Sequence, residues 1–364
     1  MNYRVLCVTD RSDLPETELF IGLMNSGVDI EVFCNPTGRY YQRLLNSAVK
    51  TMPLILKSRY DLSGIRSIRR QLKSKNYDII YCFNNPAASN ALLAARNIQI
   101  KFVTYRGTIG NIHLLSPASW TTHLNPRVKR IVCVSNAVRD HLLNMKFLSF
   151  KISPERIATI YKGHDVKWYQ NTRADLSEFN IPDGSFVVGF AGRNRPHKGI
   201  DVLIDSAKWL PERAPIHFLL MGGFEADKRL IRVIDSSPSK EKVHLIKYRK
   251  DVPAIAAACD TFVMPSTKRE GLSRAVIEAM SCGTPPIVSN VGGLPELVIN
   301  NDSGLVVPPK NPRAIAGAIL FLYRHPERKI IMGKNARERI EMHFNTEKTV
   351  AETKEMFERL ARDP

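Results

Sequence analysis

The amino-acid sequence predicts an α/β protein of two doubly wound, Rossmann-like domains that face each other across a cleft. The chain has 364 residues, more than a single core usually supports. Short apolar runs alternate with helical stretches twice, and a polar stretch at 166–185 without clear periodicity separates the two series. Such alternation is typical of parallel sheets covered on both faces, which bind ligands at the carboxyl ends of their strands.

The apolar runs give the expected elements in order. In the first half, strands are expected at 5–8, 29–33, 78–82, 100–105 and 130–134, and helices near 14–27, 63–76, 87–96 and 135–146. In the second half, strands are expected at 186–191, 217–221, 243–246, 261–265 and 286–289, and helices near 200–209, 252–258, 274–281 and 312–324. We therefore expect an N-terminal domain over 1–168 and a C-terminal domain over 169–345. A last amphipathic helix in 346–364 is expected to return toward the first domain, with an apolar side formed by Val350, Met356, Phe357 and Leu360.

Composition is that of an ordinary globular protein, with 44% hydrophobic and 24% charged residues. No run approaches the roughly 18 apolar residues that a membrane span needs, and the first residues lack a basic-then-apolar export signal. The six cysteines lie mostly in apolar runs and form no C-x-x-C pair. The sequence therefore predicts a cytoplasmic protein with buried, reduced cysteines.

The formal net charge of +18 requires a partner. The segment Arg39 to Lys75 holds ten basic residues against one acid, Asp61, with tyrosines and aliphatic residues between them. This pattern suits an anionic membrane surface and predicts a peripheral position at the inner face of the cytoplasmic membrane. A solvated basic face is the alternative. Nucleic acid is not expected as a partner, because the chain has no zinc-finger spacing, ribonucleoprotein signature or heptad-linked basic helix.

A glycine-flanked loop follows the strand expected at 186–191. It carries Gly192, Arg193, Lys198 and Gly199 before the next helix. Arginine offers a planar fork and lysine a point charge, so the loop is suited to a diphosphate, although a basic pair in a loop is also common on solvated surfaces. The Walker pattern G-x-x-x-x-G-K-[ST] is absent.

Two glutamates follow the strand expected at 261–265. Glu270 lies in the loop at its carboxyl end, where the backbone amides of Gly271, Leu272 and Ser273 are expected to face a ligand. Glu278 falls in an apolar helical run, five residues past Ser273, a plausible helix cap. A carboxylate buried there needs hydrogen-bond donors, which the vicinal diol of a ribose supplies. The alternative for Glu278 is an outward-facing surface residue.

These motifs resemble the retaining GT-B glycosyltransferases of family four. The resemblance rests on "GFAGRNRPHKGID", on Glu270 and Glu278 eight positions apart, and on "AMSCGTPPIVSNVGGLPELV", and it covers about residues 157–345. It implies that Glu278 holds the ribose hydroxyls, that Glu270 contacts the transferred sugar, and that Arg193 and Lys198 bind the diphosphate. The first half resembles the family only in its strand pattern.

The same resemblance implies further positions and a mechanism. Lys247, Tyr248 and Arg249 correspond to the segment near the nucleobase, and Gly163 and Asp165 fit a hinge motif in which Lys162 replaces a common asparagine. Negative charge develops on the diphosphate as its bond to the sugar breaks, and basic side chains stabilise it. The family retains configuration by a front-face path without a protein nucleophile. With no D-x-D cluster, we expect no metal and no cofactor other than the nucleotide-sugar donor.

The sequence departs from the family at two places. The loop after the first strand, "TDRSDLPE", lacks the usual glycines. After the strand expected at 100–105, Arg106 stands where many relatives have a histidine near the transferred sugar. Arg106 is expected to bind a carboxylate on the donor or a phosphate on the acceptor, unless it pairs with a structural acid. His113 and His123 are alternative polar candidates.

The sequence predicts a retaining glycosyltransferase that moves a sugar from a nucleoside-diphosphate sugar to a cell-envelope glycan or glycolipid such as lipopolysaccharide core. The expected donor is a UDP-sugar. Its catalytic candidates are Glu270, Arg193, Lys198 and Arg106. Two alternatives stay open: a nucleotide-sugar 2-epimerase of the same architecture, and a non-catalytic basic protein that binds membranes or nucleic acid.

Overall fold

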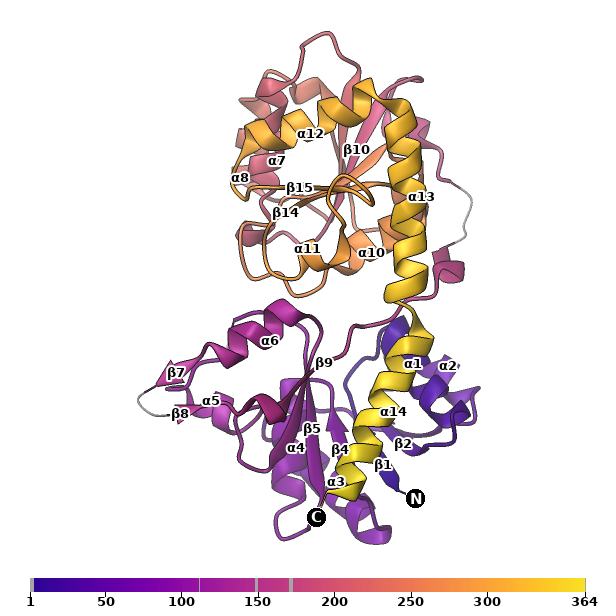
Figure 1. Ribbon diagram of the computed structural model, residues 1–364, viewed down its shortest axis with the longest axis vertical. Helices are drawn as coiled ribbons and strands as arrows, with labels where there is room; N and C mark the ends of the chain where they lie inside the picture. The colour runs from indigo at the N-terminus through magenta and orange to yellow at the C-terminus, as the bar shows by residue number, and fades with distance from the viewer. Residues whose placement is uncertain (1–2, 111, 148–149, 170–172, 364) are drawn as a thin grey trace. The chain divides into compact units, whose positions relative to one another are not determined.

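A computed structural model describes residues 3–110, 112–147, 150–169 and 173–363. The chain forms two compact units (Figure 1): unit 1 comprises Met1–Gly163 and Phe344–Pro364, and unit 2 comprises His164–His343. The first boundary precedes the predicted one at 168/169, because the 3-10 helix η2 (Val166–Tyr169) packs against helices of unit 2. Residues 170–172 of the predicted polar stretch lie outside the described residues.

Unit 1 is built on a seven-stranded parallel sheet in the order β3-β2-β1-β4-β5-β6-β9. Its strands are β1 (Arg4–Val8), β2 (Asp29–Cys34), β3 (Lys50–Pro53), β4 (Ile79–Cys82), β5 (Lys101–Arg106), β6 (Val128–Cys133) and β9 (Ile157–Thr159). Five of them match predicted runs. The edge strands β3 and β9 were missed because each is short and neither is fully buried, so neither forms an uninterrupted apolar run.

Helices cover this sheet and complete its core. They are α1 (Leu14–Asn25), α2 (Tyr41–Leu45), α3 (Leu62–Ser74), α4 (Asn85–Ala94), α5 (Pro117–Trp120), α6 (Asn136–Leu143) and α14 (Thr346–Arg362); a short hairpin, β7 (Lys146–Phe147) and β8 (Phe150–Lys151), follows α6. Helix α14 packs against α1 within unit 1. All four apolar residues predicted for its packed side, Val350, Met356, Phe357 and Leu360, lie in the core of this unit.

Unit 2 contains a six-stranded parallel sheet in the order β12-β11-β10-β13-β14-β15. Its strands are β10 (Phe186–Ala191), β11 (Ile216–Met221), β12 (Val243–Ile246), β13 (Thr261–Met264), β14 (Pro286–Ser289) and β15 (Leu305–Val307). Its helices are α7 (Ile200–Ser206), α8 (Lys228–Asp235), α9 (Val252–Ala258), α10 (Arg274–Ser281), α11 (Leu294–Leu297), α12 (Pro312–Arg324) and α13 (Pro326–His343). The two doubly wound sheets confirm the predicted fold class.

Helix α13 was not predicted. It begins at Pro326, directly after α12, and buries only the widely spaced Met332, Gly333, Ala336 and Ile340 in a strongly charged sequence, so its apolar stripe is too thin to stand out. Among the described residues, no helix has both the length and the apolar character to span a bilayer. The six cysteines are free, and all are buried except Cys282, which is partly exposed.

Each sheet reverses its strand order once. In unit 1 the reversal lies between β1 and β4, and in unit 2 it lies between β10 and β13. Loops that leave adjacent strands in opposite directions open a crevice at the carboxyl ends, which is where doubly wound sheets bind ligands. The loops after β10 and β13 carry the sequence motifs, so the fold places the motifs at the switch point of unit 2.

Candidate active site

The loops after β10 and β13 are fastened to each other. The backbone N–H of Thr267 donates to the carbonyl of His197 at 2.8 Å. Gly199 has φ of +70° and packs so closely that a Cβ atom there would lie 2.1 Å from the carbonyl oxygen of Pro265. Only glycine fits both constraints, and this contact sets the position of the neighbouring Lys198.

Lys198 and Glu270 form an ion pair at this point. The Lys198 ammonium lies 3.0 Å from each carboxylate oxygen of Glu270, and the Ser266 hydroxyl donates to one of these oxygens at 2.8 Å. The side chains of Lys198 and Glu270 are only 16% and 10% exposed. Because a sugar and its diphosphate share one bond in a nucleotide-sugar, residues that bind the two parts must be adjacent. The structure places Lys198, predicted to bind the diphosphate, next to Glu270, predicted to contact the transferred sugar.

Local backbone geometry turns Glu270 inward. Arg269, directly before it, has φ of +63°, an uncommon value for a residue with a side chain. The carbonyl of Glu270 accepts from the backbone N–H of Gly293 at 3.3 Å, which adds the β14–α11 loop to the site. Strained residues persist where the surrounding contacts fix them, and they cluster at functional sites. Ser266 and Gly293 were missed by sequence analysis, although both follow strand ends at this edge.

Glu278 lies in the middle of α10 and is not an outward-facing surface residue. Its side chain is 15% exposed, and the Arg274 guanidinium lies 3.3 Å from its carboxylate one turn earlier. For comparison, Glu338 in the equivalent i, i+4 pair with Lys334 is 48% exposed. Ser273 is the N-cap residue of α10, as predicted, but its side chain makes no capping hydrogen bond. Gly271 and Ser273 are buried and Leu272 is half-buried, so this turn lies close against the unit.

Arg193 and Gly192 begin the loop after β10. Arg193 is exposed and has no ion-pair partner within the described part of the chain, so its guanidinium is free to meet a ligand. Gly192 is held from the neighbouring loop, because a Cβ atom on Gly222 would lie 2.1 Å from the Gly192 carbonyl oxygen. This close approach of the β10 and β11 loops was not predicted.

Tyr248 and Arg249 follow β12 and differ in availability. Tyr248 is 81% exposed, and its backbone nitrogen lies next to Gly223 of the β11–α8 loop. Arg249 is engaged within unit 2: its guanidinium donates to Asp251 at 2.6 and 2.8 Å and to Glu178 at 2.9 Å. These bonds raise its pKa and hold the side chain in place. Tyr248 therefore offers a free ring face, whereas a role for Arg249 requires it to leave two acids.

The remaining candidates lie in unit 1. Arg106 is the last residue of β5 and is buried, with one N–H donating to the carbonyl of Gly110. His113 is exposed. His123 is buried, with its ring nitrogens 3.0 Å from the Thr104 hydroxyl and 3.0 Å from the Asn85 side-chain oxygen. Burial, and then the charges of Arg106 and Arg59, lower the pKa of His123 to about 3, so it is a neutral structural residue.

A charge cluster in unit 1 joins Lys162 to the glycine-free segment after β1. Lys162 donates to Asp13 at 2.8 Å and lies 3.7 Å from Glu16, and both acids belong to the glycine-free segment after β1. Burial, and then the charge of Asp13, raise the pKa of Glu16 to about 7 although Lys162 acts in the opposite direction. The pairing of Lys162 with residues 149 positions away was beyond sequence analysis.

Comparison with known proteins finds glycosyltransferases similar to both halves of the chain. Two sequence families match the chain: Glycosyltransferase Family 4 over residues 17–168 and Glycosyl transferases group 1 over residues 171–339. The UDP-Gal:alpha-D-GlcNAc-diphosphoundecaprenol alpha-1,3-galactosyltransferase of Escherichia coli is 27% identical over 97% of this chain and 94% of the relative. A solved glycosyltransferase from Rickettsia africae ESF-5 aligns with a TM-score of 0.83 at 19% identity over 100% of both chains. Anabaena Alr3699/HepE in complex with UDP-glucose aligns with a TM-score of 0.75 at 20% identity, over 97% of this chain and 99% of HepE.

Two Rossmann-like sheets and the likeness to solved structures of this architecture define the GT-B fold. The matches to both halves of the chain agree with that class. The chain belongs to the group 1 glycosyl transferases.

Proposed function

We propose that the protein is a retaining glycosyltransferase that moves a sugar from a UDP-sugar to a lipid-linked glycan or glycolipid of the cell envelope, of which lipopolysaccharide core is one example. The observation that carries this proposal is the buried Lys198–Glu270 pair at the switch point of unit 2. A cation and a carboxylate side by side suit the two linked halves of a sugar diphosphate. The E. coli relative is named for a UDP-Gal donor and the HepE structure is a complex with UDP-glucose, which supports UDP as the carrier.

The proposed reaction follows from where charge develops. The bond between the anomeric carbon and the diphosphate oxygen breaks, the acceptor oxygen bonds to the same face of that carbon, and the acceptor proton passes to the departing diphosphate. Lys198 and the free Arg193 stabilise the negative charge of the diphosphate as it forms. Glu270 holds the sugar through its hydroxyl groups. In this scheme the side chains supply the charge stabilisation, and we propose that no metal ion is needed.

The donor site is tested by calorimetric titration with UDP-, GDP- and ADP-sugars. We expect UDP-sugars to bind, and Glu278→Gln to weaken that binding about 10- to 100-fold, since two hydroxyl donors lose a charged acceptor. Glu338→Gln is the matched control, because it removes the acid of an exposed i, i+4 pair in the same unit. Equal affinity in both variants would refute a ribose role for Glu278, and absence of binding to any nucleotide-sugar would refute the proposed function.

A simple incubation separates transfer from epimerisation. A 2-epimerase converts a UDP-sugar without an acceptor, so an epimer in a reaction that contains only protein and UDP-sugar would contradict the proposal. A non-catalytic binding protein would leave the donor unchanged with every acceptor.

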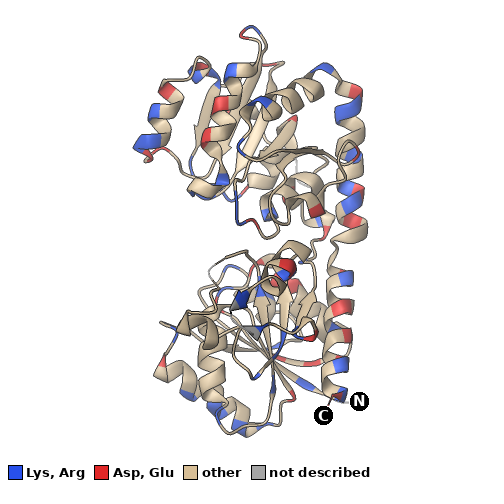
Figure 2. Ribbon diagram, turned by 60° about the vertical axis from the view of Figure 1, so that its left-hand side comes forward, with Lys and Arg blue, Asp and Glu red and all other residues tan. Residues whose placement is uncertain are grey.

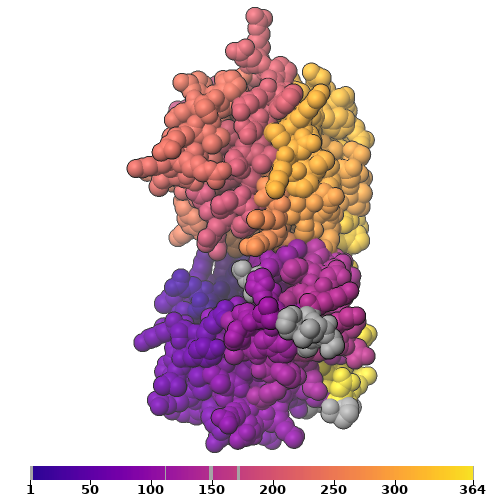
Figure 3. Space-filling view, turned by 90° about the vertical axis from the view of Figure 1, so that its left-hand side faces the viewer, coloured from indigo at the N-terminus to yellow at the C-terminus, as the bar shows by residue number. Residues whose placement is uncertain are grey.

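The acceptor class rests on the basic segment Arg39 to Lys75 of unit 1, which lies at the surface in Figure 3 among indigo and violet atoms. The structure reduces its charge. Arg43 pairs with Glu18, whereas Arg69 keeps its charge and donates to backbone carbonyls of residues 94 and 96. Asp61, its one acid, caps α3.

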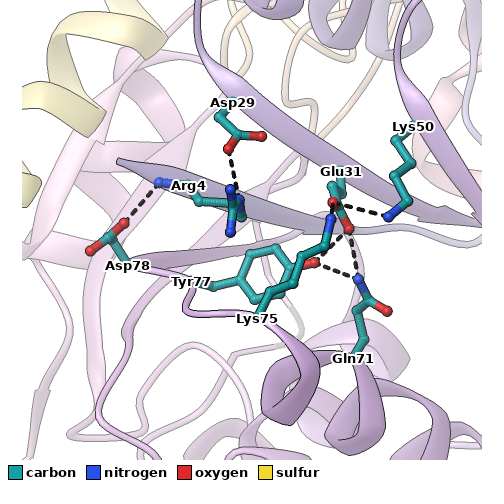
Figure 4. Close-up of polar contacts among 8 residues, drawn as sticks. All are labelled: Arg4, Asp29, Glu31, Lys50, Gln71, Lys75, Tyr77 and Asp78. Carbon is teal, nitrogen blue, oxygen red and sulfur yellow. Dashed lines mark hydrogen bonds and ion pairs between the residues drawn. The ribbon is translucent and has the colours of Figure 1, made fainter. Parts of the chain in front are cut away.

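Two further lysines of the segment form ion pairs with Glu31, a buried acid of β2 (Figure 4). Glu31 is 3.3 Å from Lys50 and also pairs with Lys75, and it accepts from Gln71 at 2.7 Å and from Tyr77 at 2.6 Å. Burial would raise the pKa of Glu31, but the hydrogen bonds lower it below its usual range. Seven basic residues remain without an acid partner within the described ranges: Arg39, Lys57, Arg59, Arg66, Arg69, Arg70 and Lys73.

The free basic residues are accompanied by exposed apolar side chains. Leu62, Arg66, Arg70 and Lys73 are all exposed on α3 at a spacing of three and four, so they form one stripe. Leu45, Ile55 and Tyr60 are exposed at 47%, 50% and 55%, whereas Leu54, which the sequence suggested as part of the patch, is buried. Basic residues also occur on helices elsewhere (Figure 2), but this stripe combines charge with apolar surface. We propose that it contacts anionic lipid.

Vesicle sedimentation tests the lipid contact. Replacing Arg66, Arg70 and Lys73 by glutamine should lower partitioning onto vesicles with anionic lipid about 100-fold, since each basic residue contributes about 1 kcal/mol. The matched control replaces Lys228, Arg229 and Arg232, which are exposed on α8 of unit 2. If both triple variants lose partitioning equally, binding depends on net charge alone, and the stripe is not the contact.

A further inference from the structure

Arg106 is a buried cation with few partners. It is 7% exposed, and a single N–H, to the carbonyl of Gly110, accounts for all its hydrogen bonds in the described part of the chain. An arginine side chain has five N–H donors. Burying a charge with its donors unsatisfied is costly, so such a group is kept where a ligand completes its bonding.

Two structural arginines of unit 1 show the contrast. Arg127 donates to the carbonyls of Leu92, Ala95 and Ile98 at 3.0, 2.8 and 3.2 Å. Arg156 donates to the carbonyls of Val128 and Asn125 at 3.0 and 2.8 Å. Backbone oxygens therefore accept three hydrogen bonds from Arg127 and two from Arg156, against one from Arg106.

No acid forms an ion pair with Arg106 within the described ranges, so the structural acid considered from the sequence is not found. Burial raises the pKa of the nearby Cys133 thiol to about 12, which keeps it neutral. Burial, and then the charges of Arg106 and His113, lower the pKa of His141. Arg59 also lies within electrostatic reach of this cluster, since its charge acts on His123.

The location suits a substrate. Arg106 ends β5, and Cys133 beside it ends β6, so both lie at the carboxyl edge of the unit 1 sheet. Arg59 belongs to the basic segment with exposed apolar residues, and Tyr60 next to it donates to the Thr121 hydroxyl at 3.2 Å. This contact links the proposed lipid-facing segment to the loop after β5.

We propose that Arg106 binds a phosphate of the acceptor, the diphosphate that joins a glycan to its lipid. The inference rests on the proposed function. A buried guanidinium with unsatisfied donors, with Arg59 in electrostatic reach, suits a group with more than one negative charge, and the planar fork of arginine matches phosphate oxygens. A carboxylate on the donor sugar is the outcome that the test below excludes.

The test compares Arg106→Met with Arg127→Met in the full-length protein. With UDP at saturation to fill unit 2, titration of inorganic pyrophosphate should show at least tenfold weaker binding to Arg106→Met and unchanged binding to Arg127→Met. The melting temperature should show the opposite order. That of Arg127→Met should fall, because three carbonyls lose their donor, whereas that of Arg106→Met should stay level or rise.

Three results would overturn the assignment. The first is no binding of pyrophosphate to the wild-type protein, and the second is equal binding of pyrophosphate to Arg106→Met and wild type. The third is weaker binding of UDP-glucuronate to Arg106→Met with normal binding of UDP-galactose and pyrophosphate, which places the anion on the donor. Binding of UDP alone is measured in each variant. Its absence in the wild type would count against the proposed function, whereas the pyrophosphate comparison would still judge Arg106.

Discussion

Lys198→Met is expected to lower the turnover number about 100- to 1000-fold, the usual loss when one preorganised group that stabilises developing negative charge is removed. The ammonium lies in a mostly buried position 3.0 Å from both oxygens of Glu270, so it acts where water screens little. Release of UDP from the donor identified by calorimetry, in the presence of a lipid-linked acceptor, measures the rate. Lys208→Met, which removes an exposed lysine paired with Asp205, should leave the rate unchanged.

A second variant separates chemistry from folding. Lys198→Met leaves the buried Glu270 carboxylate with Ser266 as its one remaining partner among the described residues, and breaking a buried pair from one side costs about 3–5 kcal/mol. The double variant Lys198→Met with Glu270→Gln removes that orphan charge and should recover most of the melting temperature, but not the activity. Recovery of activity along with stability would show that Lys198 acts only as a structural partner.

Gly163→Ala is expected to destabilise unit 1 by about 3 kcal/mol, at the upper end for an overpacked site. A Cβ atom there would lie 2.1 Å from the carbonyl oxygen of Asn345 and 2.5 Å from the Thr349 hydroxyl oxygen. The Asn345 backbone cannot move aside at low energetic cost. The Thr349 hydroxyl cannot do so either, because it donates to the Tyr161 carbonyl at 2.8 Å. The two chain segments that leave unit 1 meet here, so the start of α14 should loosen.

Hydrogen exchange of α14 and the thermal melting curve measure this effect. The control is Gly317→Ala in α12, where an added Cβ atom meets nothing within 4 Å, and where alanine should stabilise the helix by up to about 1 kcal/mol. The two glycine substitutions should therefore move the melting temperature in opposite directions. A neutral Gly163→Ala with unchanged exchange of α14 would contradict the tight contact.

Some elements were predictable because their signals are local. The bounds of α10 (Arg274–Ser281) and α12 (Pro312–Arg324) equal the predicted ranges, and Asn311 with Pro312 forms an ordinary helix start. The loops after β10 and β13 were likewise found from glycine and charge at strand ends. Their assignment to a diphosphate and a sugar stays a prediction, because no ligand contact has tested it.

Other features depend on residues that are distant in sequence. Glu31 pairs with two lysines of the basic segment that lie 19 and 44 positions away in the sequence. Nothing within the segment itself indicates that these lysines are paired. The ion pair between Lys162 and Asp13 also depends on residues that are distant in sequence, and so does the availability of Arg106 and Arg193 for a ligand. Arg249 was expected near the base, yet two acids of its own unit hold it.

By itself, the sequence determined the two doubly wound sheets, the family and the loops that carry the site, because periodicity, helix caps and strand-end motifs act over a few residues. Only the tertiary structure decided which charged side chains pair with each other and which remain available for a ligand. The physical reason is that burial and pairing of a charge depend on groups that folding brings within a few ångströms, whatever their separation along the chain.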